Sequence, residues 1–165
     1  TEKFLKKDCF NIIIGAGSSG PDTRWGERNF SDLINRLNEN GSYFFYIQCG
    51  PEQNEISNNI IKNIKKKNFI NLSQMSVREV VPFFHLCDMY VGNDSFLHHV
   101  TSQSKKPSVV ILLNSPKAYT DHSLYYHRII PNNAKIEDLN HLSKYSAKSV
   151  SVEKVFNKII QIKNQ

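Results

Sequence analysis

Short apolar runs alternate along the chain with segments whose apolar residues recur at helical spacing. The runs are nearly continuous, as in strands that are covered on both faces, and this is typical of a parallel sheet. We expect strands at 9–14, 43–49, 69–72, 88–92 and 108–113. We expect helices at 27–40, at 52–66, after Ser76, at 96–104 and at 151–163. The pattern predicts an α/β fold, a doubly wound, Rossmann-like parallel sheet of five or six strands.

Local signals fix some of the element boundaries. Ser76 with Glu79 three residues later is a capping box, which predicts a helix start there, although Pro82 disturbs that helix or marks a late start. Residues 114–134 are polar and aromatic, so we expect a loop or a broken helix. Ligands of such sheets bind beyond the carboxyl ends of the strands. The candidate site loops are therefore 15–26, 49–53, 73–76, 92–96 and 114–118.

The length of 165 residues suits a single domain, 1–165, with 39% hydrophobic and 22% charged residues. No run approaches the roughly 18 apolar residues that span a bilayer, and no secretory signal is evident. The three cysteines Cys9, Cys49 and Cys87 are widely spaced, which argues against a disulfide framework and a zinc site. Because the sequence begins at Thr1 rather than Met, we expect a piece of a longer chain.

The net charge is +6 and the isoelectric point about 9.2. Much of the excess comes from Lys3, Lys6, Lys7, Lys62, Lys65, Lys66, Lys67 and the C-terminal lysines. Solvated helix ends explain this charge most simply, and an anionic membrane surface or a phosphorylated acceptor is the alternative. No recognised motif supports nucleic acid as a partner.

Gly15 to Gly20 (GAGSSG) follows a predicted strand and matches the glycine pattern of dinucleotide-binding proteins. That fingerprint needs a helix that opens within the motif, but here Pro21 follows at once. The next strand ends in Gln48 rather than in the acidic residue that binds ribose. We therefore expect no nicotinamide site, and favour a loop that holds phosphate through backbone N–H groups and hydroxyls over a plain flexible loop.

The segment 91–99 (VGNDSFLHH) lies where a strand gives way to a helix. The helix start would offer free N–H groups and a positive dipole end to phosphate, Ser95 a hydroxyl and Asp94 an acceptor for sugar hydroxyls. The simpler alternative is that Asp94 or Ser95 only caps the helix. His98 and His99 point about 100° apart on a helix, and without partners at ligand spacing we expect no metal site.

Several of these segments, taken in order, resemble glycosyltransferase family 9, the ADP-heptose:lipopolysaccharide heptosyltransferases. They are GAGSSGPDTRW, CGPEQNE, LSQMSVREVVPFFHLCD, GNDSFLHH and SKKPSVVILLNSP, and they cover roughly residues 10–130. The resemblance implies the C-terminal, nucleotide-sugar-binding half of a two-domain GT-B glycosyltransferase, with the acceptor domain and its general base missing. It also implies sugar transfer with inversion and without an essential metal or cofactor.

Carried over by position, the resemblance assigns donor contacts to Ser18, Ser19, Arg24, Glu52 or Glu55, Met75, Asp94, Ser95 and His99. The donor would be a nucleotide-diphosphate sugar such as ADP-heptose, and the acceptor a lipopolysaccharide or another glycan or lipid-linked acceptor. Thr23 replaces a frequent family Lys, and Phe96 replaces the Gly that follows Asp-Ser. A non-catalytic nucleotide-binding module and a GT-B sugar-nucleotide epimerase domain are the alternatives. We expect the 165-residue chain alone to be inactive, and a cytoplasmic location that extends to the inner face of the cytoplasmic membrane.

Overall fold

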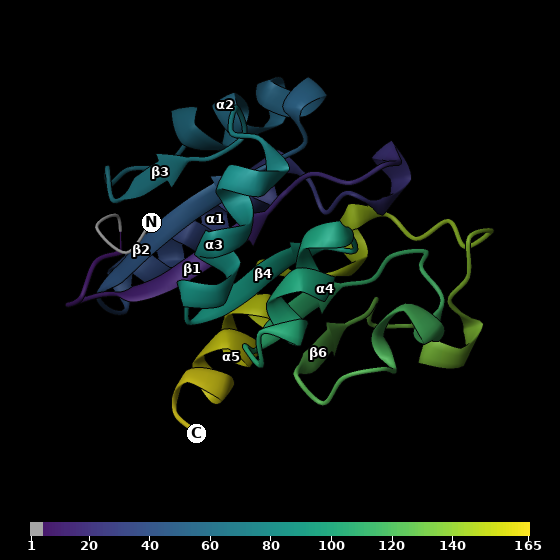
Figure 1. Ribbon diagram of the computed structural model, residues 1–165. Helices are drawn as coiled ribbons and strands as arrows, with labels where there is room; N and C mark the ends of the chain where they lie inside the picture. Colours follow the sequence, from purple (N-terminus) through teal and green to yellow (C-terminus); the bar gives the residue numbers. More distant parts are fainter. Residues whose placement is uncertain (1–4) are drawn as a thin grey trace.

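The computed structural model describes residues 5–165, so Lys3 lies outside the described residues. Six strands form one sheet, all parallel, in the order β3-β2-β1-β4-β5-β6 (Figure 1). Their bounds are β1 Phe10–Gly15, β2 Tyr43–Gln48, β3 Phe69–Asn71, β4 Met89–Asn93, β5 Ser108–Ile111 and β6 Tyr126–Ile129. This order is that of a doubly wound sheet, which confirms the predicted fold class.

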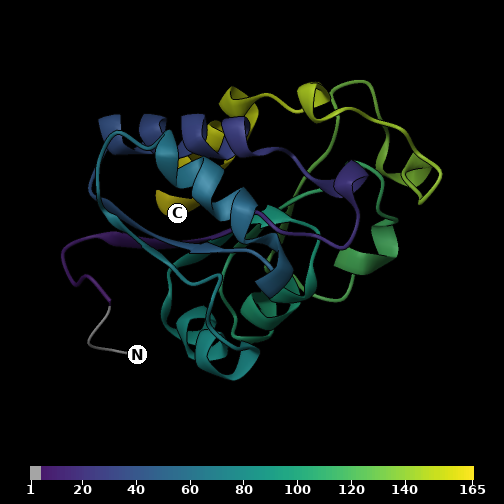
Figure 2. The same ribbon diagram turned by 90° about the horizontal axis from the view of Figure 1, so that it is seen from above.

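Helices cover both faces of the sheet, as the continuous apolar strands predicted (Figure 2). The helices are α1 Glu27–Glu39, α2 Asn54–Lys62, α3 Val77–Leu86, α4 Phe96–Gln103 and α5 Val152–Lys163. Helices α1, α2 and α5 pack on one face and α3 and α4 on the other. The capping box at the start of α3 is confirmed, with the Ser76 N–H donating to the Glu79 carboxylate at 2.9 Å.

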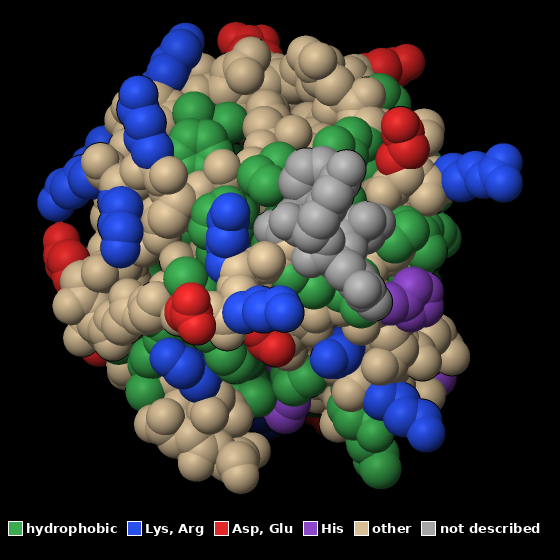
Figure 3. Space-filling model, turned by 60° about the vertical axis from the view of Figure 1, so that its left-hand side comes forward, with side chains coloured by type: hydrophobic (Ala, Val, Ile, Leu, Met, Phe, Trp, Pro, Cys, Tyr) green, Lys and Arg blue, Asp and Glu red, His purple; other side chains and the backbone are tan. Residues whose placement is uncertain are grey.

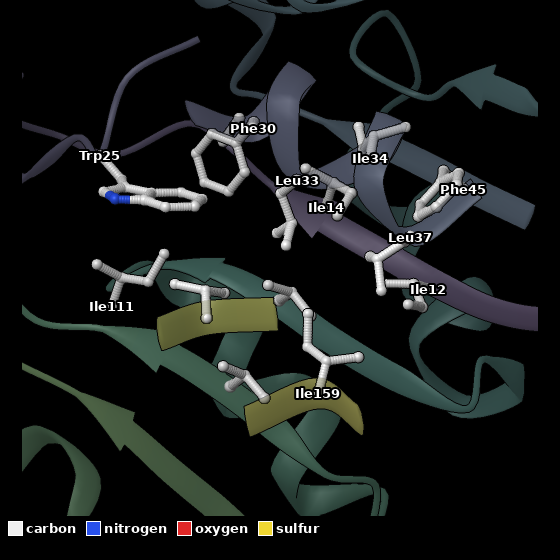
Figure 4. Packing of buried hydrophobic residues seen from close by; sticks show 14 of the residues in the cluster. Ile12, Ile14, Trp25, Phe30, Leu33, Ile34, Leu37, Phe45, Ile111 and Ile159 are labelled. Atoms are coloured by element: carbon white, nitrogen blue, oxygen red, sulfur yellow. The ribbon is translucent and has the colours of Figure 1, made fainter. Parts of the chain in front are cut away.

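Strand β1 shows how the sheet separates two cores. Ile12 and Ile14 are fully buried on the α1 face, and Ile13 is fully buried on the α3 face, because successive side chains of a strand point to opposite faces. On the α1 face the core extends to Trp25, whose ring meets Phe30 edge to face at a centroid distance of 5.0 Å (Figure 4). Each fully buried side chain of this kind contributes about 1.5–3 kcal/mol to folding.

Two predictions of secondary structure need correction. Helix α2 is shorter than 52–66, because Pro51 to Gln53 forms a 3₁₀ turn and the chain leaves the helix at Asn63. The segment 114–134 is not merely a loop or broken helix: it holds a 3₁₀ turn, Lys117–Thr120, and the edge strand β6. Strand β6 forms through backbone hydrogen bonds with β5. Its sequence has no apolar run from which a strand could be predicted.

The position of the Lys and Arg side chains on the surface shows how the basic charge of the chain is distributed. On the face shown in Figure 3, the described Lys and Arg side chains stand apart, with Asp, Glu and neutral side chains between them. All four lysines of the 62–67 segment are exposed. Among residues 5–165, no helix is long and apolar enough to cross a membrane.

Candidate functional site

The two central strands, β1 and β4, lie side by side but lead to helices on opposite faces of the sheet, which makes their carboxyl ends the topological switch point. Gly15 and Gly92 pair there. A Cβ on Gly92 would collide with the Gly15 carbonyl oxygen and the Tyr90 hydroxyl, so only glycine fits. The Tyr90 hydroxyl fills the space and donates to the Asn93 carbonyl at 2.8 Å. This close packing brings loop 15–26 against the start of α4.

Asn93 fastens the loop after β1 to the end of β4. Its buried side chain accepts a hydrogen bond from the Trp25 backbone N–H at 2.9 Å and donates to the Ala16 carbonyl at 2.7 Å. The Trp25 indole N–H in turn donates to the Val150 carbonyl at 2.8 Å, just before α5. Sequence reasoning missed Asn93 as a positioning residue, because an Asn beside an Asp-Ser pair gives no signal of contacts 68 and 77 residues away.

No helix opens within the glycine-rich loop, which confirms the prediction. The loop runs into a 3₁₀ turn, Pro21–Thr23, and α1 starts at Glu27. The Ser18 hydroxyl donates to the Gly20 carbonyl at 2.9 Å and accepts from Thr23 at 2.5 Å. The Ser18 side chain therefore shapes the loop. Ser19 is exposed.

A cavity of about 260 Å³ opens at the switch point, between the loops that follow β1 and β2 and the starts of α3 and α4. It is lined by Gly17, Ser18, Ser19, Gln48, Cys49, Gly50, Pro51, Gln53, Val77, Ser95, Phe96 and Leu97. Phe96 is 59% exposed and Val77 is 61% exposed, so the rim presents apolar surface that no described residue covers. Ser95 is the N-cap residue of α4, but its side chain makes no capping hydrogen bond. The simple capping role considered for Ser95 is thus not what its side chain does.

Two residues that line this cavity carry buried acceptors without a partner. The side-chain amide oxygens of Gln48 and Gln53 have no hydrogen-bond partner among the described residues. The amide nitrogen of Gln53 donates to the Ser18 carbonyl at 2.7 Å, which fixes the orientation of the group. A buried acceptor left unpaired costs about 1–3 kcal/mol, so a donor that reaches either oxygen after a small shift of its side chain would be favoured. The sequence did not predict site roles for Gln48 and Gln53, because the resemblance assigned the role near the nucleoside to the acidic residues Glu52 or Glu55.

The remaining predicted site residues are not all brought to this cavity. Glu52 and Glu55 are exposed and line no part of it, and Met75 packs against the core beside α3 while Val77 reaches the rim. Arg24 lies on the other side of the loop, in a hollow of about 490 Å³ that it shares with Lys144 and Tyr145. Its guanidinium donates to the Ser18 carbonyl at 3.2 Å.

Asp94 and His99 face β6 rather than the cavity. The Asp94 carboxylate lies 2.6 Å from Nε2 of His98, which is fully buried. Nδ1 of His99 lies 3.0 Å from the Tyr126 hydroxyl and 3.4 Å from Nε2 of His122. The structure therefore brings together Asp94 and three histidines, two of them adjacent on α4 and the third from the segment after β5.

The electrostatics of this group follow from burial and neighbours. Burial, with smaller contributions from His98 and His122, lowers the pKa of His99 to about 4, so its imidazole is neutral near pH 7. Burial raises the pKa of Asp94, but hydrogen bonds from His98 and Ser115 outweigh it, and the net pKa lies below its ordinary value. Asp94 is thus a carboxylate at neutral pH.

A larger hollow, of about 680 Å³, lies over the outer side of α1 and the end of α2, far from the carboxyl ends of the strands. Its charges have partners: Arg28 with Asp32, Lys65 with Glu39, and Arg36 with Glu153 of α5. These exposed pairs leave no convergent group for a ligand, and the switch-point cavity is the better candidate site.

A doubly wound parallel sheet with a cavity at its switch point, and with the start of a helix facing that cavity, is the arrangement that many nucleotide-binding α/β domains share. Residues 2–158 match the family model described as glycosyltransferase family 9 (heptosyltransferase). The chain belongs to this family, as its sequence motifs indicated.

Solved structures of the family share the fold. E. coli ADP-heptose lps heptosyltransferase II is 20% identical with a TM-score of 0.81, covering 98% of this chain and 48% of its own. A family 9 glycosyltransferase from Veillonella parvula DSM 2008 is 16% identical with a TM-score of 0.81, covering 98% and 48%. E. coli heptosyltransferase WaaC with ADP is 14% identical with a TM-score of 0.73, covering 95% and 45%. This chain thus spans about half of those proteins, and its sheet is one domain of the GT-B fold. A comparison with curated protein sequences gave no significant match.

Proposed function

We propose that the chain is the donor-binding half of a heptosyltransferase-like enzyme, and that the switch-point cavity takes the nucleoside of a nucleotide-diphosphate sugar. The observation that carries this proposal is the switch-point cavity itself, which has an apolar rim and is lined by Gln48 and Gln53, two residues whose buried amide oxygens lack a partner among the described residues. Ribose hydroxyls and nucleobase amino groups are donors, and a base needs apolar surface to stack on. Gln53 takes the place that the resemblance gave to Glu52 or Glu55.

The start of α4 supports the position of the diphosphate. The N-terminus of a helix attracts phosphate through free N–H groups and its dipole, and the Ser95 hydroxyl is not engaged in capping. Ser18 and Ser19 lie across the same cavity. From there the donor sugar would extend along α4 toward Asp94 and His99. Heptosyltransferase WaaC with ADP and heptosyltransferase TibC in complex with ADP-D-beta-D-heptose favour an adenine nucleotide and a heptose.

In this arrangement the chain binds and orients the donor and stabilises the negative charge that develops on the leaving diphosphate. We propose that the acceptor, a lipopolysaccharide or another glycan, and the general base belong to the other domain of the fold. The chain by itself should bind the donor without transferring its sugar. A cytoplasmic location, with basic side chains touching an anionic membrane that carries the acceptor, completes the proposal.

Calorimetric titration of the chain with ADP, UDP, GDP and their sugars tests the proposal. We expect ADP and ADP-heptose to bind, and Gln53→Ala to weaken ADP binding about 10-fold through the loss of one hydrogen bond to a buried acceptor. Glu52→Ala, one residue away and exposed, is the matched control and should bind ADP like the wild type. Absence of nucleotide binding by the folded wild-type chain contradicts the proposal.

A further inference from the structure

Three histidines and one aspartate gather where β4 passes into α4, on the side that faces β6. His98 and His99 come from the first turns of α4, Asp94 precedes the helix, and His122 arrives from the segment between β5 and β6. The sequence predicts no metal site, because the His98–His99 pair has no partners at ligand spacing along the chain. The fold supplies those partners.

One potential ligand atom from each of Asp94, His98 and His99 lies within 4.8 Å of the others. Ligands around a tetrahedral ion, each about 2.0–2.1 Å from it, are separated by roughly 3.3 Å, so a small contraction places an ion among them. The Asp94 carboxylate and Nε2 of His98, at 2.6 Å, already share one proton, and an ion can replace that proton. None of the three side chains is exposed, which limits the rotamer entropy lost on binding.

His122 offers a further nitrogen. Its Nε2 lies 3.4 Å from Nδ1 of His99, close to the spacing of two tetrahedral ligands, and both nitrogens lie 3.0 Å from the Tyr126 hydroxyl. His98 also has a buried Nδ1 without a hydrogen-bond partner among the described residues, so the hydrogen bonds within the group do not satisfy it fully. The two nitrogens of one imidazole point in divergent directions, so the nitrogen of His98 that can join Asp94 at an ion is Nε2, and Nδ1 points away from that ion.

We propose that Asp94, His98 and His99 bind a divalent transition-metal ion of the zinc class, with His122 as the nearest fourth ligand. Imidazole nitrogens together with a carboxylate oxygen suit Zn²⁺ and its neighbours, whereas Mg²⁺ and Ca²⁺ prefer oxygen ligands. Bound there, the ion ties the segment that carries His122 to the start of α4. It lies beside the sugar end of the proposed donor site and shares Asp94 and His99 with it.

Titration of the purified, metal-free chain with Zn²⁺ by calorimetry tests this proposal, with Co²⁺ absorption as a second readout of tetrahedral geometry. We expect one ion per chain, and at least about a 10-fold loss of affinity in His99→Gln. His141→Gln is the matched control: His141 is exposed, among the described residues its ring bonds only the Tyr119 hydroxyl, and its loss should leave Zn²⁺ affinity unchanged.

Substitution of the fully buried His98 can disturb folding, so His99→Gln and His122→Gln are the decisive variants, each checked by circular dichroism. An absence of Zn²⁺ binding, or equal binding by wild type, His99→Gln and the His141→Gln control, overturns the proposal. ADP has no donor sugar and reports on the cavity alone. If ADP binds and Zn²⁺ does not, the metal site is rejected and the donor proposal remains. If Zn²⁺ binds and ADP does not, the donor proposal is rejected and the metal site remains.

Discussion

The two sides of the β4–α4 junction differ in chemistry although their residues follow one another in the sequence. Ser95 and Phe96 face the cavity beside β1 and β2, which is largely apolar and is lined by two residues with buried, unpaired acceptors. Asp94, His98 and His99 face β6 and form a group of titratable side chains. The sequence predicts a single donor site in the segment 92–99. In the fold, the first turn of α4 divides this segment into two sides, a nucleotide side (Ser95 and Phe96) and a polar side (Asp94, His98 and His99).

The largest expected effect is that of Gly92→Ala, which should disturb the nucleotide side and the polar side of the junction together. In Gly92→Ala the added methyl group meets the Gly15 carbonyl and the Tyr90 hydroxyl, and the central strands must separate. We expect a loss of about 3 kcal/mol in the free energy of unfolding, measured with urea. Gly20→Ala, whose new Cβ has its nearest neighbour at 3.9 Å, should change stability by less than about 0.5 kcal/mol. Equal stability of the two variants contradicts the close packing at the switch point.

Asn93→Ala loosens the nucleotide side. The Trp25 N–H and the Ala16 carbonyl lose their buried partner, so we expect a cost of about 2 kcal/mol in unfolding free energy. Hydrogen exchange should rise in residues 16–25 and stay unchanged around His122. Asn157→Ala, on the exposed side of α5, serves as the control for replacement of an Asn. Uniform exchange throughout the variant would show that Asn93 does not fasten this loop.

Phe96→Ala affects ligand binding on the nucleotide side alone. Stacking of a base on an aromatic ring contributes about 1–3 kcal/mol, so the affinity for ADP should fall by about 5-fold or more. Calorimetry measures this change. Leu124→Ala, which removes a 97% exposed side chain outside the cavity, is the control. If ADP affinity is unchanged or higher in Phe96→Ala, the ring does not support the base.

The smallest effect concerns the polar side and pH. His99 has a pKa of about 4 in the fold against 6.5 ordinarily, so between these values the unfolded chain binds a proton that the folded chain does not. Stability should therefore decline as pH falls from 6.5 toward 4. Partial solvent access reduces the contribution to about 1 kcal/mol, below the roughly 3 kcal/mol of the full shift.

His99→Gln should flatten this decline, and His141→Gln should not. Urea unfolding at a series of pH values gives the comparison. His127, Glu79 and Asp94, whose pKa values are also lowered in the fold, contribute to the slope that remains in His99→Gln. An unchanged slope in His99→Gln would contradict the assigned environment of the imidazole.

The sequence was sufficient for elements that bury continuous apolar runs, and insufficient where a contact joins distant segments. Strands β1, β2 and β4 and the start of α3 follow from local pattern and capping chemistry. Strand β6 does not, because YHRI becomes a strand only by pairing with β5. For the same reason, the roles of Gln53 and His122 could not be predicted from the sequence. Each side chain finds its partners in another segment, which the sheet brings close to it.

The central claim is that the nucleotide occupies the side of the junction that faces β1 and β2. Backbone NMR of the chain during titration with ADP tests it most directly. We predict the largest shift changes at Gly17 to Ser19, Gln53, Ser95 and Phe96, with little change at His122 and Tyr126. Changes centred on His122 and Tyr126, with Gln53 and Phe96 unaffected, would place the nucleotide on the polar side and contradict the account.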